Sequence, residues 1–279
     1  MKKISRRSFL AAAGLSVAAL ALTACGGSSA STASSVASSA ASSEAASTSA
    51  AAGELTTVEA GKLTMATNAA FPPYEMTTDA GEFEGIDIET AQAIADKLGL
   101  ELQIDDMDFD AALLSVQQGK ADIVMAGVTV TDERKAVMDF SDSYATGIQS
   151  IIVPEGSDIA SPDDLAGKKI GTQRGTTGYI YCSDDFGDDN VVAYDDGLTA
   201  VQALNNGQVD AVVIDNAPAK EFVAANPGLV ILDTSYAEED YAIGMAKGSS
   251  LEDAVNAALK ELKADGTLQS ILDKYITAE

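Results

Sequence analysis

Arg134 carries a positive charge close to four acidic residues, Asp132, Glu133, Asp139 and Asp142, in a chain with 43 acidic and 17 basic residues. It lies in the run GVTVTDERKAVMDFSDSY, where Thr131 can cap a helix that begins at Asp132. Arg134 would be the third residue of that helix, and its neighbours would point elsewhere because successive helical residues differ by about 100° in direction. Its guanidinium would then suit the carboxylate of a small ligand. A surface ion pair with Asp139 or Asp142 is the alternative that the spacing leaves open.

Two other stretches carry groups that bind anions. In the strand-like run before Arg134, Gly127 allows close approach to the backbone and the Thr129 hydroxyl can donate a hydrogen bond. The loop QRGTTG (173–178) places a glycine and threonines at the start of a predicted helix, where free backbone N–H groups face an anion. An ordinary turn is the more frequent cause of a glycine-rich loop this short. It is not a phosphate-binding loop, because a lysine followed by Ser or Thr at the required spacing is absent from it.

A carboxylate and two aromatic rings complete the set of candidate binding groups. Asp215 follows the apolar run AVVI, so its side chain is expected at the carboxyl end of a buried strand. There it can pair with an ammonium group, or it can cap the helix that follows. Phe71 in NAAFPPYE and Phe109 in MDFD lie on predicted loops and can enclose a ligand, although either ring can equally belong to the core.

These residues are distributed over alternating strands and helices. The hydrophobic periodicity predicts strands over 62–67, 101–107 and 121–130, helices over 88–99 and 111–119, and a late strand over 241–246 before a helix over 250–266. Strands and helices that alternate at this spacing are typical of βαβ units in a mainly parallel sheet.

The second half of the chain repeats the pattern of the first. The segment LLSVQQGKADIVMAG is echoed by VQALNNGQVDAVVID, with Gly119 and Asp122 matched by Gly207 and Asp210. We therefore expect two similar α/β lobes with mainly parallel sheets, joined by a hinge of two strands. The predicted bounds are 54–143 with 242–279 for lobe 1, 149–237 for lobe 2, and 144–148 and 238–241 for the hinge segments.

Composition excludes several classes of function. The chain contains no histidine, which rules out Ser-His-Asp and Cys-His catalysis and histidine-ligated metal sites. A formal net charge of −26 disfavours nucleic acid as a partner, because phosphate would be repelled. No cofactor or metal site is predicted, and Cys182 is left without an intramolecular disulfide partner once Cys25 is modified.

The N-terminus predicts export and anchoring. Residues 1–25 have a basic start and an apolar run too short to span a bilayer comfortably, which is typical of a signal peptide. They end in Leu-Thr-Ala-Cys, similar to the lipobox of bacterial lipoproteins, so Cys25 is the predicted lipidation site. The run SRRSFL also resembles a twin-arginine motif, and the general secretory route remains open. Residues 26–53 are mostly Ser and Ala and are predicted to form a disordered tether.

From residue 56 to 277 the chain resembles the polar amino-acid-binding proteins of ABC importers, which are extracytoplasmic solute receptors with the type II periplasmic-binding-protein fold. The resemblance is carried by ATNAAFPPYE, GIDIETAQAIADKLG, the stretch from Met107 to Tyr144, GTQRGTTG, DAVVIDNAP and NAALKELKADGTLQSILDKY. It implies a monomeric receptor, anchored outside the cytoplasm by its lipid alone, that delivers a free L-amino acid to ABC permease subunits.

The resemblance also implies a role for each candidate residue. Arg134 would hold the ligand's α-carboxylate with the backbone N–H groups of the GTT loop, and Asp215 would hold the α-ammonium. The other implied ligand-binding residues are Asn68, Phe71, Phe109, Gly127, Thr129, Gln173, Thr176 and Thr177. Members that bind basic side chains often have an acid at the position of Asn68, so a neutral, polar side chain is favoured here.

Two functions other than that of a transport receptor are also found on this fold. One is an exported dehydratase that acts on prephenate or arogenate, which needs a carboxylic acid of raised pKa in the cleft. Glu75 and Asp87 are the available acids, but the sequence indicates no neighbour that would raise the pKa of either, so no enzyme activity is predicted. The other alternative is a sensory amino-acid-binding protein.

Overall fold

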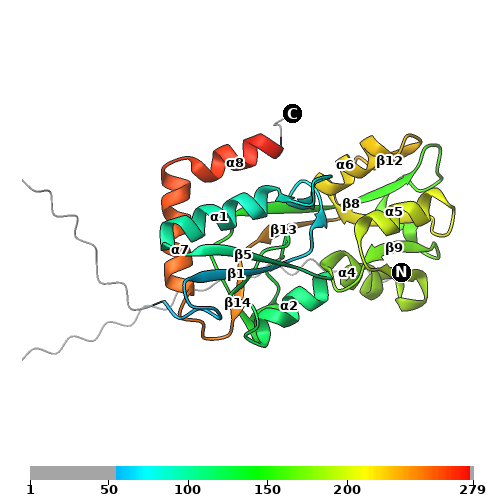
Figure 1. Ribbon diagram of the computed structural model, residues 1–279. Helices are drawn as coiled ribbons and strands as arrows, with labels where there is room; N and C mark the ends of the chain where they lie inside the picture. Colours follow the sequence, from blue (N-terminus) through cyan, green and yellow to red (C-terminus); the bar gives the residue numbers. More distant parts are fainter. Residues whose placement is uncertain (1–54, 277–279) are drawn as a thin grey trace, which may run out of the picture. The chain divides into compact units, whose positions relative to one another are not determined.

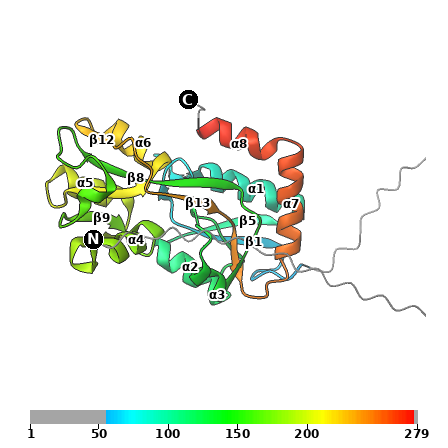
Figure 2. The same ribbon diagram turned by 180° about the vertical axis from the view of Figure 1, so that it is seen from behind.

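The computed structural model describes residues 55–276, which lie in one compact unit spanning residues 51–279. The signal peptide, Cys25 and the tether predicted above lie outside the described residues. Two mixed sheets lie in different parts of this unit, each with helices packed on it (Figures 1 and 2).

The first sheet has the strand order β5-β1-β6-β14-β7. Strand β1 pairs parallel with β5 and β6, whereas β14 pairs antiparallel with β6 and β7. The strands are β1 (Lys62–Thr67), β5 (Glu101–Asp106), β6 (Ile123–Val124), β7 (Met138–Phe140) and β14 (Gly244–Ala246). The helices of this half are α1 (Ile86–Leu98), α2 (Phe109–Gln117), α3 (Asp132–Val137), α7 (Glu252–Ala264) and α8 (Thr267–Tyr275). A small sheet beside it contains β2 (Ala70–Phe71), β3 (Glu75–Thr77) and β4 (Phe83–Glu84).

The second sheet repeats this plan with the order β10-β9-β11-β8-β12. Here β9 pairs parallel with β10 and β11, and β8 pairs antiparallel with β11, β12 and β13. The strands are β8 (Ala145–Pro154), β9 (Ile170–Gln173), β10 (Val191–Tyr194), β11 (Ala211–Asp215), β12 (Leu229–Ile231) and β13 (Ala237–Tyr241). The helices are α4 (Thr177–Phe186), α5 (Gly197–Asn205) and α6 (Asn216–Ala225), with short 3-10 turns η1 (Pro162–Leu165) and η2 (Asp188–Asn190). The predicted fold class, two similar α/β lobes of the type II kind, is confirmed.

Strand periodicity explains why each sheet is covered on both faces. In β1, Leu63 and Met65 belong to the core cluster that contains α1, α7 and α8, whereas Ala66 belongs to the cluster with α2. In β11, Val212 and Ile214 pack toward α5 and α6, whereas Ala211 and Val213 pack toward α4. Side chains that alternate between two apolar faces are typical of central strands buried on both sides.

The sequence echo corresponds to a structural repeat. The order β1-α1-β5-α2-β6 in the first half matches β9-α4-β10-α5-β11 in the second. Gly119 and Gly207 end equivalent helices with φ of 65° and 67°, a conformation that favours glycine. Asp122 accepts hydrogen bonds from the backbone N–H groups of Val58 (2.7 Å) and Thr64 (2.8 Å). Asp210 accepts one from Lys169 N (2.7 Å), immediately before β9, so each aspartate secures the start of its lobe's central strand.

The chain passes from the first sheet to the second through β8 and returns through β13. These two strands pair antiparallel from Ala145↔Tyr241 to Gln149↔Ala237. After the return, β14 inserts into the first sheet and α7 packs against α1, as predicted for the C-terminal segments. The numerical bounds of lobes and hinge given above stay a prediction.

Two predicted elements differ from the structure. The strand expected over 121–130 is limited to Ile123–Val124, because Gly127 adopts φ 55° and the chain turns toward the cavity described below. The late strand expected over 241–246 is two strands in the structure. Strand β13 of the second sheet ends at Tyr241, and strand β14 of the first sheet begins at Gly244.

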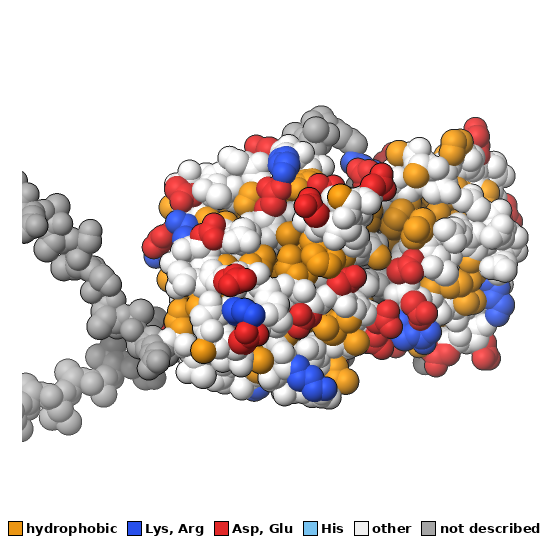
Figure 3. Space-filling model, in the orientation of Figure 1, with side chains coloured by type: hydrophobic (Ala, Val, Ile, Leu, Met, Phe, Trp, Pro, Cys, Tyr) orange, Lys and Arg blue, Asp and Glu red, His pale blue; other side chains and the backbone are white. Residues whose placement is uncertain are grey.

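Acidic residues outnumber basic residues by 43 to 17 in the sequence, and Asp and Glu side chains are scattered over the face seen in Figure 3. Within residues 55–276, no helix combines the length and the apolar character needed to cross a membrane.

Replacing Asp122 with alanine is expected to destabilise the protein by about 2–4 kcal/mol, because two backbone N–H groups lose a charged acceptor in a buried site. Urea unfolding monitored by circular dichroism measures this change. Asp79→Ala, at an exposed aspartate, is the matched control and should stay within about 0.5 kcal/mol of the unchanged protein. Equal stabilities of the two variants would contradict the role assigned to Asp122.

Candidate ligand-binding site

A partly enclosed cavity lies where elements of both sheets meet. All ten residues predicted to bind the ligand line it. The lining residues are Asn68, Phe71, Glu75, Phe109, Ala126, Gly127, Thr129, Arg134, Gln149, Gln173, Thr176, Thr177, Val213, Ile214 and Asp215. Strands β1, β9 and β11 deliver Asn68, Gln173 and Asp215 at or just beyond their carboxyl ends, where ligands of open α/β sheets bind.

Arg134 is buried at one side of this cavity. As predicted, Thr131 caps α3, and its hydroxyl oxygen accepts a hydrogen bond from Arg134 N (3.2 Å). The guanidinium donates from Nη1 to Thr129 O (2.8 Å) and from Nη2 to Gly175 O (3.2 Å), and it lies 5.4 Å from the centre of the Phe109 ring. The surface ion pair left open by the sequence is wrong for Asp139, which pairs with Lys247 (2.6 Å).

The loop that contains Gly175 leads directly into α4. Thr176 is the N-cap residue, and its hydroxyl accepts from Tyr179 N (3.3 Å) and donates to Gln173 O (2.8 Å). The first amides of a helix have no intrahelical acceptor and carry the positive end of the helix dipole. Because Thr176 and Thr177 line the cavity, this helix start faces the same space as Arg134.

Asp215 is buried, with 8% of its surface exposed, and lines the cavity from the second sheet. Its carboxylate accepts hydrogen bonds from Gln149 Nε2 (2.8 Å) and from the Tyr241 hydroxyl. It occupies the N-cap position of α6, but its side chain makes no capping hydrogen bond, so the capping alternative is wrong. Burial raises the pKa of Asp215 to about 7, and the Tyr241 hydroxyl partly offsets this rise.

Asn68 connects the two halves of the site. Its Oδ1 atom accepts a hydrogen bond from Gln173 Nε2 (2.8 Å), and its Nδ2 atom donates to Met107 O (3.0 Å). Together with the bond from Arg134 to Gly175 O, this contact holds elements of the two sheets against each other across the cavity.

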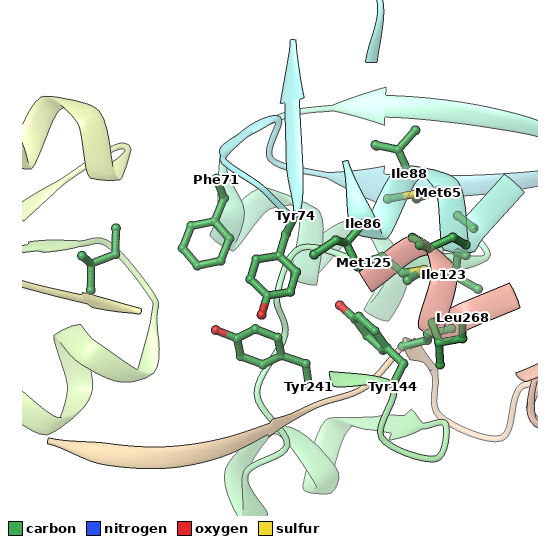
Figure 4. Packing of buried hydrophobic residues seen from close by; sticks show 14 of the residues in the cluster. Met65, Phe71, Tyr74, Ile86, Ile88, Ile123, Met125, Tyr144, Tyr241 and Leu268 are labelled. Atoms are coloured by element: carbon green, nitrogen blue, oxygen red, sulfur yellow. The ribbon is translucent and has the colours of Figure 1, made fainter. Parts of the chain in front are cut away.

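Phe71 forms an aromatic wall of the cavity, and two tyrosine rings pack behind it. Phe71 stacks on Tyr74 with ring centres 5.7 Å apart, and Tyr74 meets the edge of Tyr241 at 5.2 Å. Figure 4 shows these three rings together, with Tyr144 beside them and aliphatic side chains of the core to their right. Gly127 is required next to this wall, because a Cβ atom there would lie 2.8 Å from the Phe71 ring.

Sequence reasoning missed Gln149 and Glu239. Gln149 lies on β8, and its Nε2 atom donates both to Asp215 and to Glu239 Oε2 (3.0 Å). Glu239, on β13, also accepts a hydrogen bond from the Thr129 hydroxyl (3.1 Å). A glutamine within the otherwise apolar run of β8, and a glutamate two residues before the buried Tyr241, were the available signals.

Glu75 and Asp87 are fully buried. Asp87 Oδ2 accepts a hydrogen bond from Gly127 N (3.0 Å), and burial raises the pKa of Asp87 to about 6. Burial also raises the pKa of Glu75 well above its usual value, and the charge of Asp87 raises it further. The expectation that neither acid has a neighbour able to raise its pKa is therefore wrong, because the small sheet brings Glu75 to the start of α1.

Comparison with known proteins identifies the family to which this chain belongs. Residues 63–278 match the family model described as bacterial extracellular solute-binding proteins, family 3. The chain belongs to this family, and the resemblance predicted from the sequence motifs is confirmed.

The relatives are amino-acid-binding proteins of ABC transporters. The L-cystine-binding protein TcyJ of Escherichia coli (strain K12) is 33% identical over 226 residues, which cover 79% of this chain and 85% of that relative. An ancestral arginine-binding protein bound to glutamine is 41% identical with a TM-score of 0.75, covering 78% of this chain and 99% of the other. The structure of an ancestral arginine-binding protein bound to arginine is 42% identical with a TM-score of 0.74, covering 77% and 98%.

Stability is expected to fall as the pH rises from about 4 toward 7. In the folded protein Asp215 keeps its proton up to about pH 7 and Asp87 up to about pH 6, whereas the same groups in the unfolded chain lose their protons near their usual pKa of 3.8. Melting temperatures at pH 5 and pH 7.5 measure the difference. In Asp215→Asn this difference should shrink by several degrees, since one linked proton is removed, and in the exposed control Asp79→Asn it should not change. An unaltered difference in Asp215→Asn would contradict the raised pKa.

Proposed function

We propose that this protein is an extracytoplasmic receptor that binds a free L-amino acid and delivers it to the permease subunits of an ABC importer. The observation that carries the proposal is the presence of Arg134 and Asp215 on the same cavity, one from each half of the molecule. A guanidinium and a carboxylate so placed match the two charges of an α-amino acid.

The remaining lining residues support this assignment. The α-carboxylate would be held by Arg134 together with Thr129 and the first amides of α4, at Thr176 and Thr177. The α-ammonium would be held by Asp215, whose position is supported by Gln149 and Tyr241. Closure is proposed to occur by bending of β8 and β13 at 144–148 and 238–241, between a lobe of residues 54–143 with 242–279 and a lobe of residues 149–237.

For the ligand's side chain we propose a neutral, polar group. Asn68 and Gln173 present neutral amides, and Glu75 is neutral when it retains its proton. Phe71, Phe109 and Gly127 would provide the wall along which the side chain lies. A relative named for cystine binding and a relative solved with glutamine bound agree with this choice. Several other relatives are named for arginine binding or are solved with arginine bound, so cationic ligands are the competing outcome.

The export and anchoring of the protein are part of the proposal. A signal peptide at 1–25, lipidation at Cys25 and a disordered tether over 26–53 would hold the binding unit near the membrane as a monomer. The family's extracellular designation supports the location outside the cytoplasm.

A dehydratase on the same fold is the second candidate, and one observation favours it. Glu75 is a buried carboxylic acid of raised pKa in the cavity, which is the group needed to protonate a leaving hydroxyl. The relatives named above are binding proteins, so we place this activity second. Spectroscopic detection of prephenate turnover, abolished by Glu75→Gln, would reverse the order.

A thermal-shift screen of the twenty common amino acids tests the receptor function. An amino acid at 100 times its dissociation constant should stabilise the fold by about 2.7 kcal/mol, which is roughly 5–10 °C for a domain of this size. Arg134→Ala should lower the affinity at least a hundredfold, because a buried carboxylate would lose its charged partner. Arg174→Ala is the matched control, since Arg174 lies in the loop 173–178 but has an exposed side chain that pairs with Asp195. Absence of any stabilising amino acid would contradict the proposal.

Replacement of Cys25 with serine tests the anchor. The unchanged protein is expected in the membrane fraction and the Cys25→Ser variant in the soluble extracytoplasmic fraction, because the predicted lipid attachment needs the thiol. Fractionation followed by immunoblotting measures the distribution, and Cys182→Ser, at a buried cysteine, is the control. Retention of Cys25→Ser in the membrane would contradict lipid anchoring.

A further inference from the structure

Glu239 is a buried carboxylate on β13, one of the two strands that cross between the halves of the molecule (Figure 2). It is not among the residues that line the ligand cavity. Its Oε2 atom accepts hydrogen bonds from the Thr129 hydroxyl of the first half (3.1 Å) and from Gln149 Nε2 on β8 (3.0 Å). Because a buried carboxylate has to be satisfied by donors, these contacts hold the donor groups in place.

Helix α4 of the second half presents two hydroxyl groups to the same place. Thr177 and Tyr181 are four residues apart, so their side chains lie on one face of the helix. The Thr177 hydroxyl lies 3.5 Å from the Thr129 hydroxyl, and the Tyr181 hydroxyl hydrogen-bonds to Glu239. Burial and the charge of Glu239 both raise the pKa of Tyr181, so the Tyr181 hydroxyl keeps its proton and stays a donor.

These contacts add to the one that Arg134 makes between the halves. Arg134 donates to Gly175 O in the loop before α4, and the bound amino acid of the proposed function would contact Arg134 and the start of α4. Glu239 and Tyr181 lie outside the cavity lining, so they connect the halves without contact with the ligand.

The charge of Glu239 alone does not decide the affinity for an amino acid. Glu239 acts on both Arg134 and Asp215, which are the proposed partners of the ligand's carboxylate and ammonium groups. Its negative charge opposes the first ligand group and favours the second, and the two effects offset each other. The hydrogen bonds that Glu239 accepts from the two halves remain as its contribution.

We propose that Glu239 is a positioning residue that latches the two halves together, because it accepts hydrogen bonds from Thr129 of the first half and from Tyr181 of the second. This inference rests on the proposed function, and it assigns part of the ligand affinity to a contact outside the cavity. The halves have to separate before a bound amino acid can leave, so the latch sets how long the ligand is retained, whatever side chain it carries.

Calorimetry and stopped-flow tyrosine fluorescence of Glu239→Gln with L-glutamine and L-arginine test the proposal. If either ligand does not bind, the tightest other amino acid of the thermal-shift screen replaces it. Loss of a charged acceptor should raise both dissociation constants about five- to twentyfold, mainly through faster dissociation, and leave their ratio unchanged within about twofold. Glu238→Gln, at the adjacent exposed glutamate, is the matched control and should behave as the unchanged protein.

Small-angle X-ray scattering separates a latch between the halves from a change confined to the cavity. The radius of gyration of the unchanged protein should fall when the amino acid saturates it. At saturation Glu239→Gln should contract less, because its ligand-bound form opens more often, whereas Glu238→Gln should contract as the unchanged protein does.

A second variant guards against misfolding of Glu239→Gln. Tyr181→Phe keeps the carboxylate, its charge and every cavity residue, and should speed dissociation of both ligands about three- to tenfold. Tyr179→Phe, at a half-buried tyrosine on the same helix, is the matched control. In the Glu239→Gln background the effect of Tyr181→Phe should fall below about twofold, since the charged acceptor is already absent.

Three outcomes would overturn the proposal: a dissociation rate that is unchanged or slower in either folded variant, a ratio of the two affinities that changes more than about threefold, or full contraction of folded Glu239→Gln at saturation. In each of these cases an amino acid that binds in an Arg134-dependent manner leaves the receptor function intact. If no amino acid binds at all, the receptor function fails together with the inference.

Discussion

A buried guanidinium held by main-chain carbonyl groups is the interaction on which the site depends. Arg134 donates to Thr129 O in its own half and to Gly175 O in the other, so one side chain joins the two halves of the molecule. Carbonyl oxygens satisfy the donors but carry no full charge. Within residues 55–276 the carboxyl groups of Glu239 and Asp215 act on the guanidinium only from a distance, so the buried cation is incompletely neutralised. An anion that enters the cavity next to Arg134 therefore strengthens the contact between the halves as well as its own binding.

The polar side chains beneath the cavity come from the two strands that cross between the halves. Gln149 on β8 connects Asp215 with Glu239, and Tyr241 on β13 donates to Asp215. Gly147 leaves no space beside them, since a Cβ atom there would lie 2.6 Å from Asp215 Oδ1. A bend in these strands would shift the groups that orient Asp215, so ligand binding and the angle between the halves are physically linked.

Local patterns in the sequence were sufficient for those parts of the fold that depend on local physics. Thr131 caps α3, Gly99 ends α1 with φ 70°, and the repeated Gly-x-x-Asp pattern marks equivalent connections in both halves. Non-local pairings were not accessible in this way. Gln149 and Glu239 meet because β8 and β13 pair, and Glu75 reaches Asp87 because the small sheet folds back onto α1. The length of β6 was overestimated for a related reason, since an apolar run does not reveal where the chain turns toward a cavity.

The position of β14 has a consequence for the order in which the protein can fold. The fourth strand in the order of each sheet is antiparallel to the third: β14 in the first sheet and β8 in the second. In the second sheet β8 precedes the other strands in the sequence. In the first sheet β14, which lies between β6 and β7, follows all the others. Residues 145–241 therefore contain every strand of their own sheet, while the first sheet stays open in its middle until the last part of the chain has been synthesised. A nascent chain would complete its second half first, and closure of the N-terminal half would be the late, long-range step.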